Sequence, residues 1–269
     1  MPTLVLSHRY SPDSNALFGA ALAAGWDVER LHAFHAPPGL ARRDPVFYGE
    51  TLLADAIVDE LGLLLIEPSA AFLPRLPLRH RLRDIRLLTL AEARALTGPW
   101  FIKPTDEKVF PARVYPRGAA LDADPVFPAN LPVLVSEPVE FEVEYRFFVR
   151  DRHAPARSPY IRAGEIARGA DGGWEADETE VAEAQACADA VLADTDVELP
   201  PALVLDVGFI RGRGWAVVEA NPAWASGLCG CDPARVLAVL RRASVPRDGA
   251  GDDDRRWARG IDARLTVVR

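Results

Sequence analysis

The sequence contains little cysteine or methionine. Its 269 residues include 3 cysteines and 1 methionine. The number of cysteines is odd, and none of them has Cys-x-x-Cys spacing; they are Cys187, Cys229 and Cys231. Neither a disulfide framework nor a zinc site is therefore predicted, and free thiols are expected. The pattern gives no role to Cys229 or Cys231.

Long apolar runs and excess positive charge are also missing. No run approaches the roughly 18 apolar residues that a membrane-spanning helix needs. Met1 to Ser7 reads as a strand without a basic region and a long apolar segment, so no signal peptide is expected. The net charge of −8 and the pI near 5.2 argue against a nucleic acid or an anionic membrane as partner. We therefore expect a soluble cytoplasmic protein, and the pattern leaves its oligomeric state open.

The sequence is rich in apolar residues, at 49%, which suffices for one large domain or for two or three lobes. Strand and helix patterns alternate at its start, which is typical of βαβ units with a parallel sheet. The expected strands are Thr3–Ser7, Val28–His32 and Leu63–Ile66, and the expected helices are Ala16–Ala24 and Thr51–Leu61. An N-terminal α/β domain is predicted over residues 1–97, before the turn at Gly98-Pro99.

The segment Arg79–Arg86 is basic, which is typical either of a helix face that is solvated or paired with acids, or of an anion site. Thr89 and Glu92 then form a capping-box pattern and predict the start of a helix.

Short strands dominate after residue 97, with helices expected at 178–192 and 233–243. We expect a second domain at 98–245, divided into a small lobe at about 98–136 and a large lobe at about 137–245. The acidic, glycine-bearing residues that follow predict a linker and C-terminal tail over 246–269.

Three oxygen-bearing side chains lie on two neighbouring predicted strands. Asp206 interrupts the apolar run Leu203–Ile210, and Glu219 and Asn221 occupy alternate positions of a strand that ends at Pro222. Residues at i and i+2 share a face of a strand, and the short loop at 211–214 predicts a hairpin that brings Asp206 opposite them. Hard divalent cations such as Mg²⁺ prefer oxygen ligands.

A single acid in a strand is usually a solvated residue at an edge, and Asp206 alone indicates no more than that. Three such groups together on apolar strands cost several kcal/mol if they are buried without a cation or a charge partner, so their association needs an explanation.

Two upstream strands also carry charged side chains. One is apolar and ends at Lys103, and the other, Phe141–Val149, alternates so that Glu142, Glu144 and Arg146 share one face. Ion pairing on a solvated sheet face also accounts for that strand.

The order of these features resembles the ATP-grasp superfamily. Phe-Ile-Lys103-Pro-x-x-x-Lys108-Val-Phe and Glu144-Tyr-Arg146-x-Phe-Val are similar to the clade named for one arginine and two lysines, and the resemblance extends from Tyr48 to Gly230. It implies an α/β (α+β) ATP-grasp fold, in which an N-terminal βαβ lobe precedes two α+β lobes that clamp ATP.

The resemblance implies roles for the basic side chains. Lys103 would contact the phosphates of ATP, Lys108 the terminal phosphate, and Arg146 the phosphoryl group in transfer, which makes Lys108 and Arg146 the catalytic candidates. The loop Thr105–Pro111 contains no glycine, unlike the glycine-rich loop that covers the phosphates in many members.

It also implies the nucleoside contacts. Glu137 and the backbone of Pro138 and Val139 would contact the adenine, with Val139 as the N–H donor because proline has none. The carboxylate of Glu144 suits the ribose hydroxyls.

By the same resemblance, Asp206, Glu219 and Asn221 would hold one or two Mg²⁺ ions, with Mn²⁺ as the alternative metal. Members typically activate a carboxylate as an acyl-phosphate, which an amine or another nucleophile then attacks. The resemblance therefore implies an ADP-forming ligase that joins a carboxylate to an amine or another nucleophile, and it names neither substrate.

Substrate contacts are predicted from position alone. His8 and Arg9 end the first strand, where α/β sheets present ligands. Trp224, Ser226 and Gly227 lie in a turn of small residues after Asn221 that could cradle a substrate, although a tryptophan is more often a packing residue.

Two other functions fit the sequence. One is a ligase that modifies peptides or proteins, with the loop at 122–131 and the acidic tail as docking surface. The other is a regulatory module that binds ATP without chemistry, which would be favoured by loss of the lysines or metal ligands, all of which are present.

Overall fold

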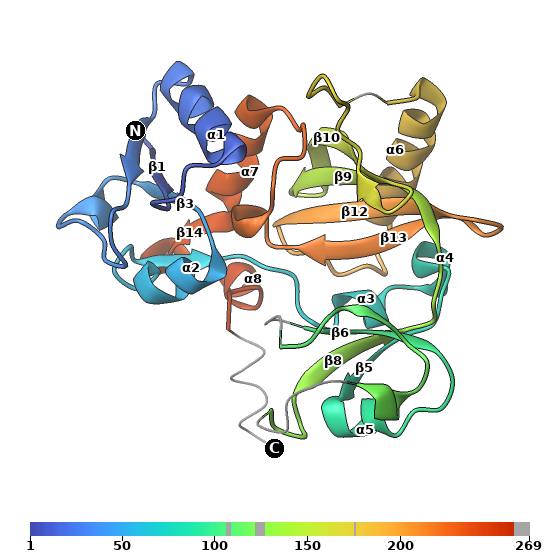
Figure 1. Cartoon of the computed structure of the whole chain (residues 1–269). Coiled ribbons are helices and arrows are strands. Elements are labelled where there is room, and N and C mark those ends of the chain that lie inside the picture. Colours follow the sequence, from blue (N-terminus) through green and yellow to red (C-terminus); the bar gives the residue numbers. More distant parts are fainter. Residues whose placement is uncertain (106–108, 122–126, 175, 261–269) are drawn as a thin grey trace.

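The computed structural model of the chain describes residues 1–105, 109–121, 127–174 and 176–260. The chain folds into three lobes (Figure 1). The N-terminal lobe lies on one side, a five-stranded sheet forms the large lobe, and a four-stranded sheet forms the small lobe.

The N-terminal lobe contains the parallel sheet expected from the alternating pattern, in the order β2-β1-β3. Its strands are β1 (Thr3–Leu6), β2 (Asp27–Arg30) and β3 (Pro45–Tyr48), and its helices are α1 (Pro12–Ala23) and α2 (Thr51–Ile57). Helix α1 begins where Ser11 and Ser14 form a capping box and Pro12 occupies the first turn. The carboxyl ends of these strands present Ser7, His8 and Tyr48.

The strand expected at Leu63–Ile66 forms but does not join the parallel sheet. Strand β4 (Leu63–Leu65) pairs antiparallel with β14 (Ser244–Pro246), which arrives from the far end of the chain. The Ser244 hydroxyl accepts the N–H of Phe47 at 3.0 Å, so β14 also covers the outer edge of β3. This pairing joins residues too far apart in the sequence for local periodicity to reveal.

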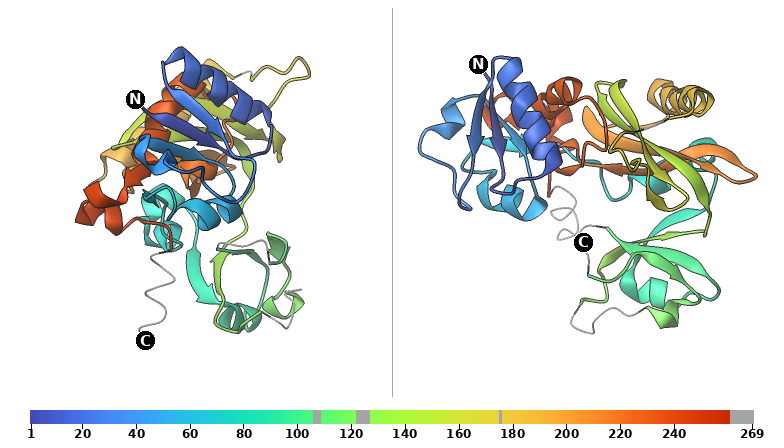
Figure 2. Two further views of the ribbon diagram at one scale, coloured as in Figure 1. Left: turned by 90° about the vertical axis from the view of Figure 1, so that its left-hand side faces the viewer. Right: turned by 45° about the horizontal axis from the view of Figure 1, so that its top comes forward.

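The large lobe is an antiparallel sheet in the order β11-β10-β9-β12-β13. Its strands are β9 (Phe141–Arg150), β10 (His153–Arg162), β11 (Glu165–Ile166), β12 (Ala202–Ile210) and β13 (Gly214–Asn221). Helix α6 (Glu178–Ala193) covers one face, and α7 (Pro233–Ala243) lies between the sheet and the N-terminal lobe (Figure 2). Both helices begin at the predicted residues, capped by Asp177 and Asp232.

The small lobe is an antiparallel sheet in the order β5-β8-β6-β7 with its own apolar core. It contains β5 (Ile85–Thr89), β6 (Trp100–Pro104), β7 (Arg113–Tyr115), β8 (Pro132–Ser136) and α5 (Leu90–Arg94). Thr89 and Glu92 form the expected capping box. Strand β5 pairs along its whole length with β8, although it precedes the boundary predicted after residue 97.

Short helices connect these lobes. Helices α3 (Phe72–Arg75) and α4 (Leu78–Arg81) pack against β13, and α3 also contacts β5. The remaining short helices are η1 (Leu40–Arg42), η2 (Gly118–Ala120), η3 (Ala223–Ala225), η4 (Arg247–Gly249) and α8 (Asp252–Arg255). The basic segment at 79–86 is paired with acids, since Arg79 contacts Asp194 at 2.5 Å and Asp196 at 2.8 Å.

The acidic stretch expected to be a linker is folded as far as residue 260. Helix α8 is held by Arg242, which contacts Asp254 at 2.7 Å, and Trp257 packs with Ile66 and Val245. Buried apolar contacts therefore override the polar composition here. Among the described residues, every helix is too short or too polar to cross a bilayer.

Candidate active site

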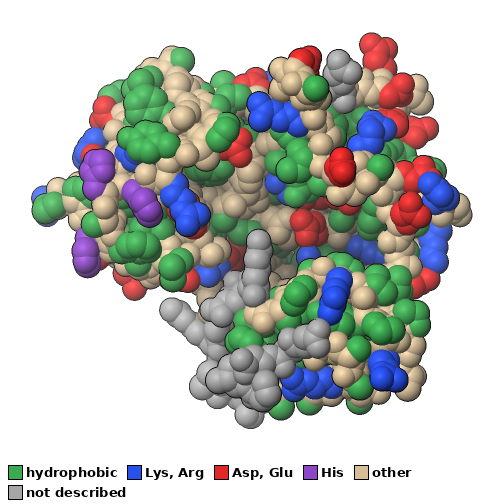
Figure 3. Space-filling model, viewed as in Figure 1, with side chains coloured by type: hydrophobic (Ala, Val, Ile, Leu, Met, Phe, Trp, Pro, Cys, Tyr) green, Lys and Arg blue, Asp and Glu red, His purple; other side chains and the backbone are tan. Residues whose placement is uncertain are grey.

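An open cleft of about 2070 Å³ lies where the three lobes meet. The space-filling view shows the surface hollowed between the N-terminal lobe and the other two (Figure 3). The large lobe contributes Arg146, Tyr160, Glu219 and Asn221 to its wall, and the small lobe contributes Lys103. The predicted site residues thus converge from separate sheets.

Arg146 and Asp206 form a buried ion pair in the floor of the large lobe. They are register partners on β9 and β12, so their side chains project from the same face of the sheet. Arg146 Nε and Nη2 donate to the two carboxylate oxygens of Asp206 at 2.9 and 2.7 Å. Asp206 is 0% exposed and Arg146 is 5% exposed.

Arg146 is held on its other sides as well. Its Nη1 donates to the carbonyl of Gly227 at 3.1 Å and to Cys229 Sγ at 3.6 Å. The Tyr160 ring lies 3.9 Å from the guanidinium carbon. These contacts fix the orientation of Arg146, and none of the residues that supply them was predicted to hold it.

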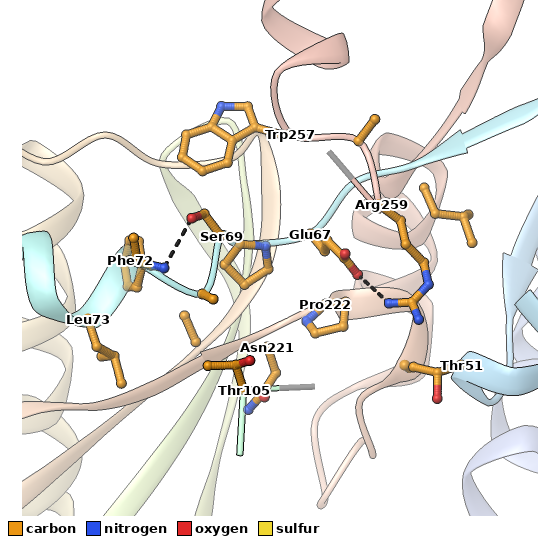
Figure 4. Close-up of a pocket in the computed structure, with 18 of the residues that line it drawn as sticks. Thr51, Glu67, Ser69, Phe72, Leu73, Thr105, Asn221, Pro222, Trp257 and Arg259 are labelled. Carbon is orange, nitrogen blue, oxygen red and sulfur yellow. Dashed lines mark hydrogen bonds and ion pairs between the residues drawn. The ribbon is translucent and has the colours of Figure 1, made fainter. Parts of the chain in front are cut away.

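Glu219 faces Asp206 across the β12–β13 hairpin, as the sequence predicted. One carboxylate oxygen of Glu219 accepts from Lys103 Nζ at 2.8 Å, and the other accepts from Asn221 Nδ2 at 2.9 Å. The ion pair with Lys103 joins β13 of the large lobe to β6 of the small lobe. The close-up shows Asn221 pointing into the cleft beside Pro222 and Thr105 (Figure 4).

Charge and burial shape the ionisation of this cluster. Burial raises the pKa of Asp206 to about 6, against the opposing charge of Arg146. Burial also disfavours ionised Glu219, but Lys103 and the hydrogen bonds outweigh it, so the pKa of Glu219 is lowered. The pKa of Arg146 is raised because Asp206 overcomes the effect of burial. Each metal-ligand candidate carboxylate therefore already has a cation beside it.

Glu144 lies two residues before Arg146 on the same face of β9, opposite Gly208. Burial, followed by the charges of Asp206 and Glu219, raises the pKa of Glu144 to about 7. Its half-buried carboxyl has no hydrogen-bond partner among the described residues.

The predicted adenine-contacting segment connects β8 to β9 and is half-buried. Glu137 contacts Arg213 at 2.5 Å, and its N–H donates to the Asp84 carbonyl at 2.9 Å. Arg213 chiefly lowers the pKa of Glu137. In the described part of the chain no acceptor contacts the Val139 N–H, which leaves this group available to a base, whereas Pro138 has none.

The substrate candidates divide into two groups. Ser226 and Gly227 line the cleft, where the Ser226 carbonyl accepts from the Tyr48 hydroxyl at 3.2 Å. Arg9 is 71% exposed and lies 3.6 Å from Glu50, outside the lining of the cleft. His8 is also exposed, with its ring 6.3 Å from that of Phe34.

Trp224, predicted with Ser226 and Gly227 in a turn that could cradle a substrate, does not line the cleft. It is 0% exposed, packs against Phe47, and donates from Nε1 to the Ile66 carbonyl at 3.0 Å. An indole that is enclosed by the core has no free face for a substrate. Lys108 lies outside the described residues.

Asp206, Glu219 and Asn221 fit a divalent cation by their chemistry. Within the described ranges, no three His, Cys, Asp or Glu side chains form a metal-binding group. The predicted set therefore depends on the Asn221 amide as its third oxygen. A half-turn of that amide would present Oδ1 in place of Nδ2.

Comparison with known families identifies the domain. Residues 80–239 match the family model of an ATP-grasp domain, which is the second family of the clade named for one arginine and two lysines. The chain belongs to this family. Membership confirms the resemblance seen in the motifs around Lys103 and Arg146, and it makes this an ATP-binding fold.

Solved ATP-grasp structures share the fold across all three lobes. The RimK domain protein ATP-grasp from Sphaerobacter thermophilus DSM 20745 is 18% identical with a TM-score of 0.51, and the match covers 89% of this chain and 100% of that one. D-cycloserine synthetase DcsG is 16% identical with a TM-score of 0.51, and that match covers 89% of this chain and 98% of the synthetase. The search of curated proteins gave no match.

Arg83 was not singled out by sequence reasoning, which treated it as one of several basic residues at 79–86. It is 6% exposed and donates to the backbone of β13. The contacts of Tyr160 and Gly227 with Arg146, and of Tyr48 with the Ser226 carbonyl, were likewise not expected. These contacts arise from tertiary folding and have no local sequence signal.

Proposed function

We propose that this ATP-grasp protein is an ATP- and Mg²⁺-dependent ligase that activates a carboxylate for attack by an amine. In the first step a substrate carboxylate oxygen bonds to the γ-phosphorus of ATP and ADP leaves. In the second step the amine attacks the acyl carbon, phosphate leaves, and a proton is lost as the amide forms. ATP-grasp family membership supports ATP-dependent ligase chemistry.

One observation carries the proposal. Lys103 and Arg146, two cations from different lobes, line one cleft. They lie within hydrogen-bonding distance of Glu219 and Asp206, respectively. A cation pair suits the transferred phosphoryl group, whose transition state spreads negative charge over its oxygens. The carboxylates, with Asn221, suit the metal that accompanies the phosphates.

The remaining residues would orient the substrates. Glu144 would accept hydrogen bonds from the ribose, and Val139 would donate its N–H to the adenine beside Glu137 and Pro138. Lys108 is proposed to contact the terminal phosphate. Ser226 and Gly227 stand next to Arg146, which makes their turn the proposed position of the acyl group.

Mg²⁺, when bound by Asp206, Glu219 and Asn221, would neutralise charge that develops on the leaving ADP. The protein's own contribution is to hold Arg146 rigidly, through Asp206, Gly227 and Tyr160, before the substrate arrives. Such preorganisation lowers the reorganisation required in the transition state.

ADP release measured against a panel of carboxylic acids and amines, with products identified by mass, tests this proposal. Turnover should require both an acid and an amine, and Glu219→Gln should lose it, whereas Glu165→Gln, at an exposed strand edge, should not. A phosphorylated acid or alcohol without amide formation would contradict the ligase assignment and indicate a kinase.

The cleft has room for a peptide or protein substrate beside ATP, which makes such a substrate the second candidate. At about 2070 Å³ it exceeds the roughly 300–1,000 Å³ typical of small-ligand pockets. Incubation of a peptide library with ATP, followed by mass spectrometry, would show modified residues. Modification of small acids alone would exclude this alternative.

A further inference from the structure

A single extra residue in β13 determines where the metal-ligand candidates point. Glu219 pairs with Asp206, but the next pair along β12 is Val207 with Val217, so Val218 has no partner of its own. This is a β-bulge. An extra residue reverses the alternation of side chains beyond it.

The reversal is visible in the packing. Before the bulge, Trp215 and Val217 pack into the apolar core beneath α6. After it, Glu219 and Asn221 line the cleft. In an unbulged strand Glu219 would occupy the same face as Val217, where an unpaired carboxylate costs several kcal/mol. The bulge therefore puts both ligands on the face that carries Asp206.

Arg83 binds the bulge from the segment that connects α4 to β5. Its Nη1 donates to the carbonyl of Val217 at 2.7 Å and its Nη2 donates to that of Val218 at 2.9 Å. Nη1 also donates to the carbonyl of Arg81 at 3.1 Å, which ties the guanidinium to its own segment. The planar fork of arginine reaches two adjacent carbonyls at once, which a lysine ammonium cannot do with the same geometry.

Space and charge around the bulge agree with this role. A Cβ at Gly208 would lie 3.0 Å from Val218 Cγ2, so the glycine leaves room for the extra residue. Burial lowers the pKa of Arg83 to about 10, so its charge persists at neutral pH, close to Glu144, Glu137 and Glu219. Arg83 is 6% exposed, so its hydrogen bonds are largely shielded from water.

We propose that Arg83 is a positioning residue for the metal site, which holds the Val218 bulge so that Glu219 and Asn221 face the cleft. This inference rests on the proposed function, because it assumes that these two residues bind Mg²⁺. Arg83 would act through the backbone of β13 and would touch neither metal nor substrate.

The test compares Arg83→Lys and Arg83→Gln with a matched control, Arg152→Lys. Arg152 also donates to backbone carbonyls, of Leu192, Asp194 and Val197, but lies on the turn between β9 and β10. Mn²⁺ affinity is measured by electron paramagnetic resonance with a non-hydrolysable ATP analogue. Nucleotide affinity is measured calorimetrically in EDTA, and stability by thermal unfolding.

Both Arg83 variants should weaken Mn²⁺ binding by about tenfold or more, as is typical when a supporting contact of a ligand is lost. Their nucleotide affinity in EDTA should stay within about twofold of wild type, because Arg83 supports the metal ligands and EDTA removes the metal. The Arg152→Lys control should keep the wild-type Mn²⁺ affinity even if it is less stable.

Three results would overturn the inference. If wild type binds Mn²⁺ and both variants bind it with unchanged affinity, the role of Arg83 is refuted and the proposed function stands. Loss of cooperative unfolding in both would make Arg83 a residue of the fold. Absence of Mn²⁺ binding by wild type would refute the proposed metal-dependent function, and this inference with it.

Discussion

At the scale of single residues, the buried pair of Arg146 and Asp206 shows how much each member depends on the other. Asp206 is 0% exposed, and both of its oxygens accept from the Arg146 guanidinium. Removing one partner leaves the other charge buried without compensation, which costs more than the pair contributes.

Asp206→Ala should therefore lower the free energy of unfolding by about 3–5 kcal/mol, measured by urea denaturation. Glu142→Ala removes the more exposed ion pair with Arg211 and should cost about 1 kcal/mol or less. Equal losses in the two variants would show that burial does not govern the Arg146 pair.

The raised pKa of Glu144 predicts how the stability of the protein depends on pH. Burial, with Asp206 and Glu219, raises it from 4.5 to about 7. Between these values the folded chain retains a proton that the unfolded chain loses, so this carboxyl makes wild type less stable as pH rises through that window. Below it the effect is absent.

Glu144→Gln removes the titration. The melting temperature of the variant relative to wild type should rise between pH 4.5 and pH 7 and then level off. Differential scanning fluorimetry across this range measures it. A constant difference between the two curves would contradict the raised pKa.

At the scale of elements, much was predictable from local pattern. The β12–β13 hairpin followed from local pattern, although Asp206 pairs with Glu219 only because of the Val218 bulge. Helices α5, α6 and α7 begin at the caps that Thr89, Asp177 and Asp232 provide. These features depend on neighbours in the sequence, which periodicity and capping rules describe.

Other features depended on distant partners and could not be predicted. The Val218 bulge is defined only by its opposition to β12, and β4 pairs with β14, which lies in a distant part of the sequence. The enclosure of Trp224 likewise results from packing against the N-terminal lobe. The division into residues 1–97, 98–245 and 246–269 stays a prediction, while β5, from before residue 97, joins the small-lobe sheet.

Close packing around Gly208 in β12 predicts that a larger side chain at this position destabilises the protein. A Cβ there would lie 2.9 Å from the Val143 carbonyl oxygen and 2.7 Å from Phe141, so Gly208→Ala should destabilise the protein by about 1–3 kcal/mol. Gly19→Ala adds a Cβ that meets nothing within 4 Å in helix α1, and should be neutral or stabilise by up to about 1 kcal/mol. Chemical denaturation of both variants checks the pair; similar effects would refute the steric explanation.

At the scale of the whole molecule, the Lys103–Glu219 ion pair joins two lobes. It spans 2.8 Å between side chains that are 26% and 28% exposed. A partly exposed pair contributes up to about 1 kcal/mol, enough to change the balance between closed and open lobes by about fivefold.

Lys103→Met should therefore increase the radius of gyration of the nucleotide-free protein, measured by small-angle X-ray scattering. Raising the salt concentration should expand wild type in the same direction and affect the variant less, because salt screens the pair. Identical scattering from wild type and variant at low salt would show that the pair does not hold the lobes together.

The N-terminal lobe and the large sheet share one apolar core, in which Leu4, Leu17 and Phe47 belong to the same cluster as Phe148 and Leu240. The family match at 80–239 therefore cuts through a cooperative folding unit. A fragment limited to those residues would expose its part of that core to water and should remain unfolded or aggregate, as circular dichroism and gel filtration would show. The small lobe, whose core is separate, is the part that hydrogen exchange should find opening independently.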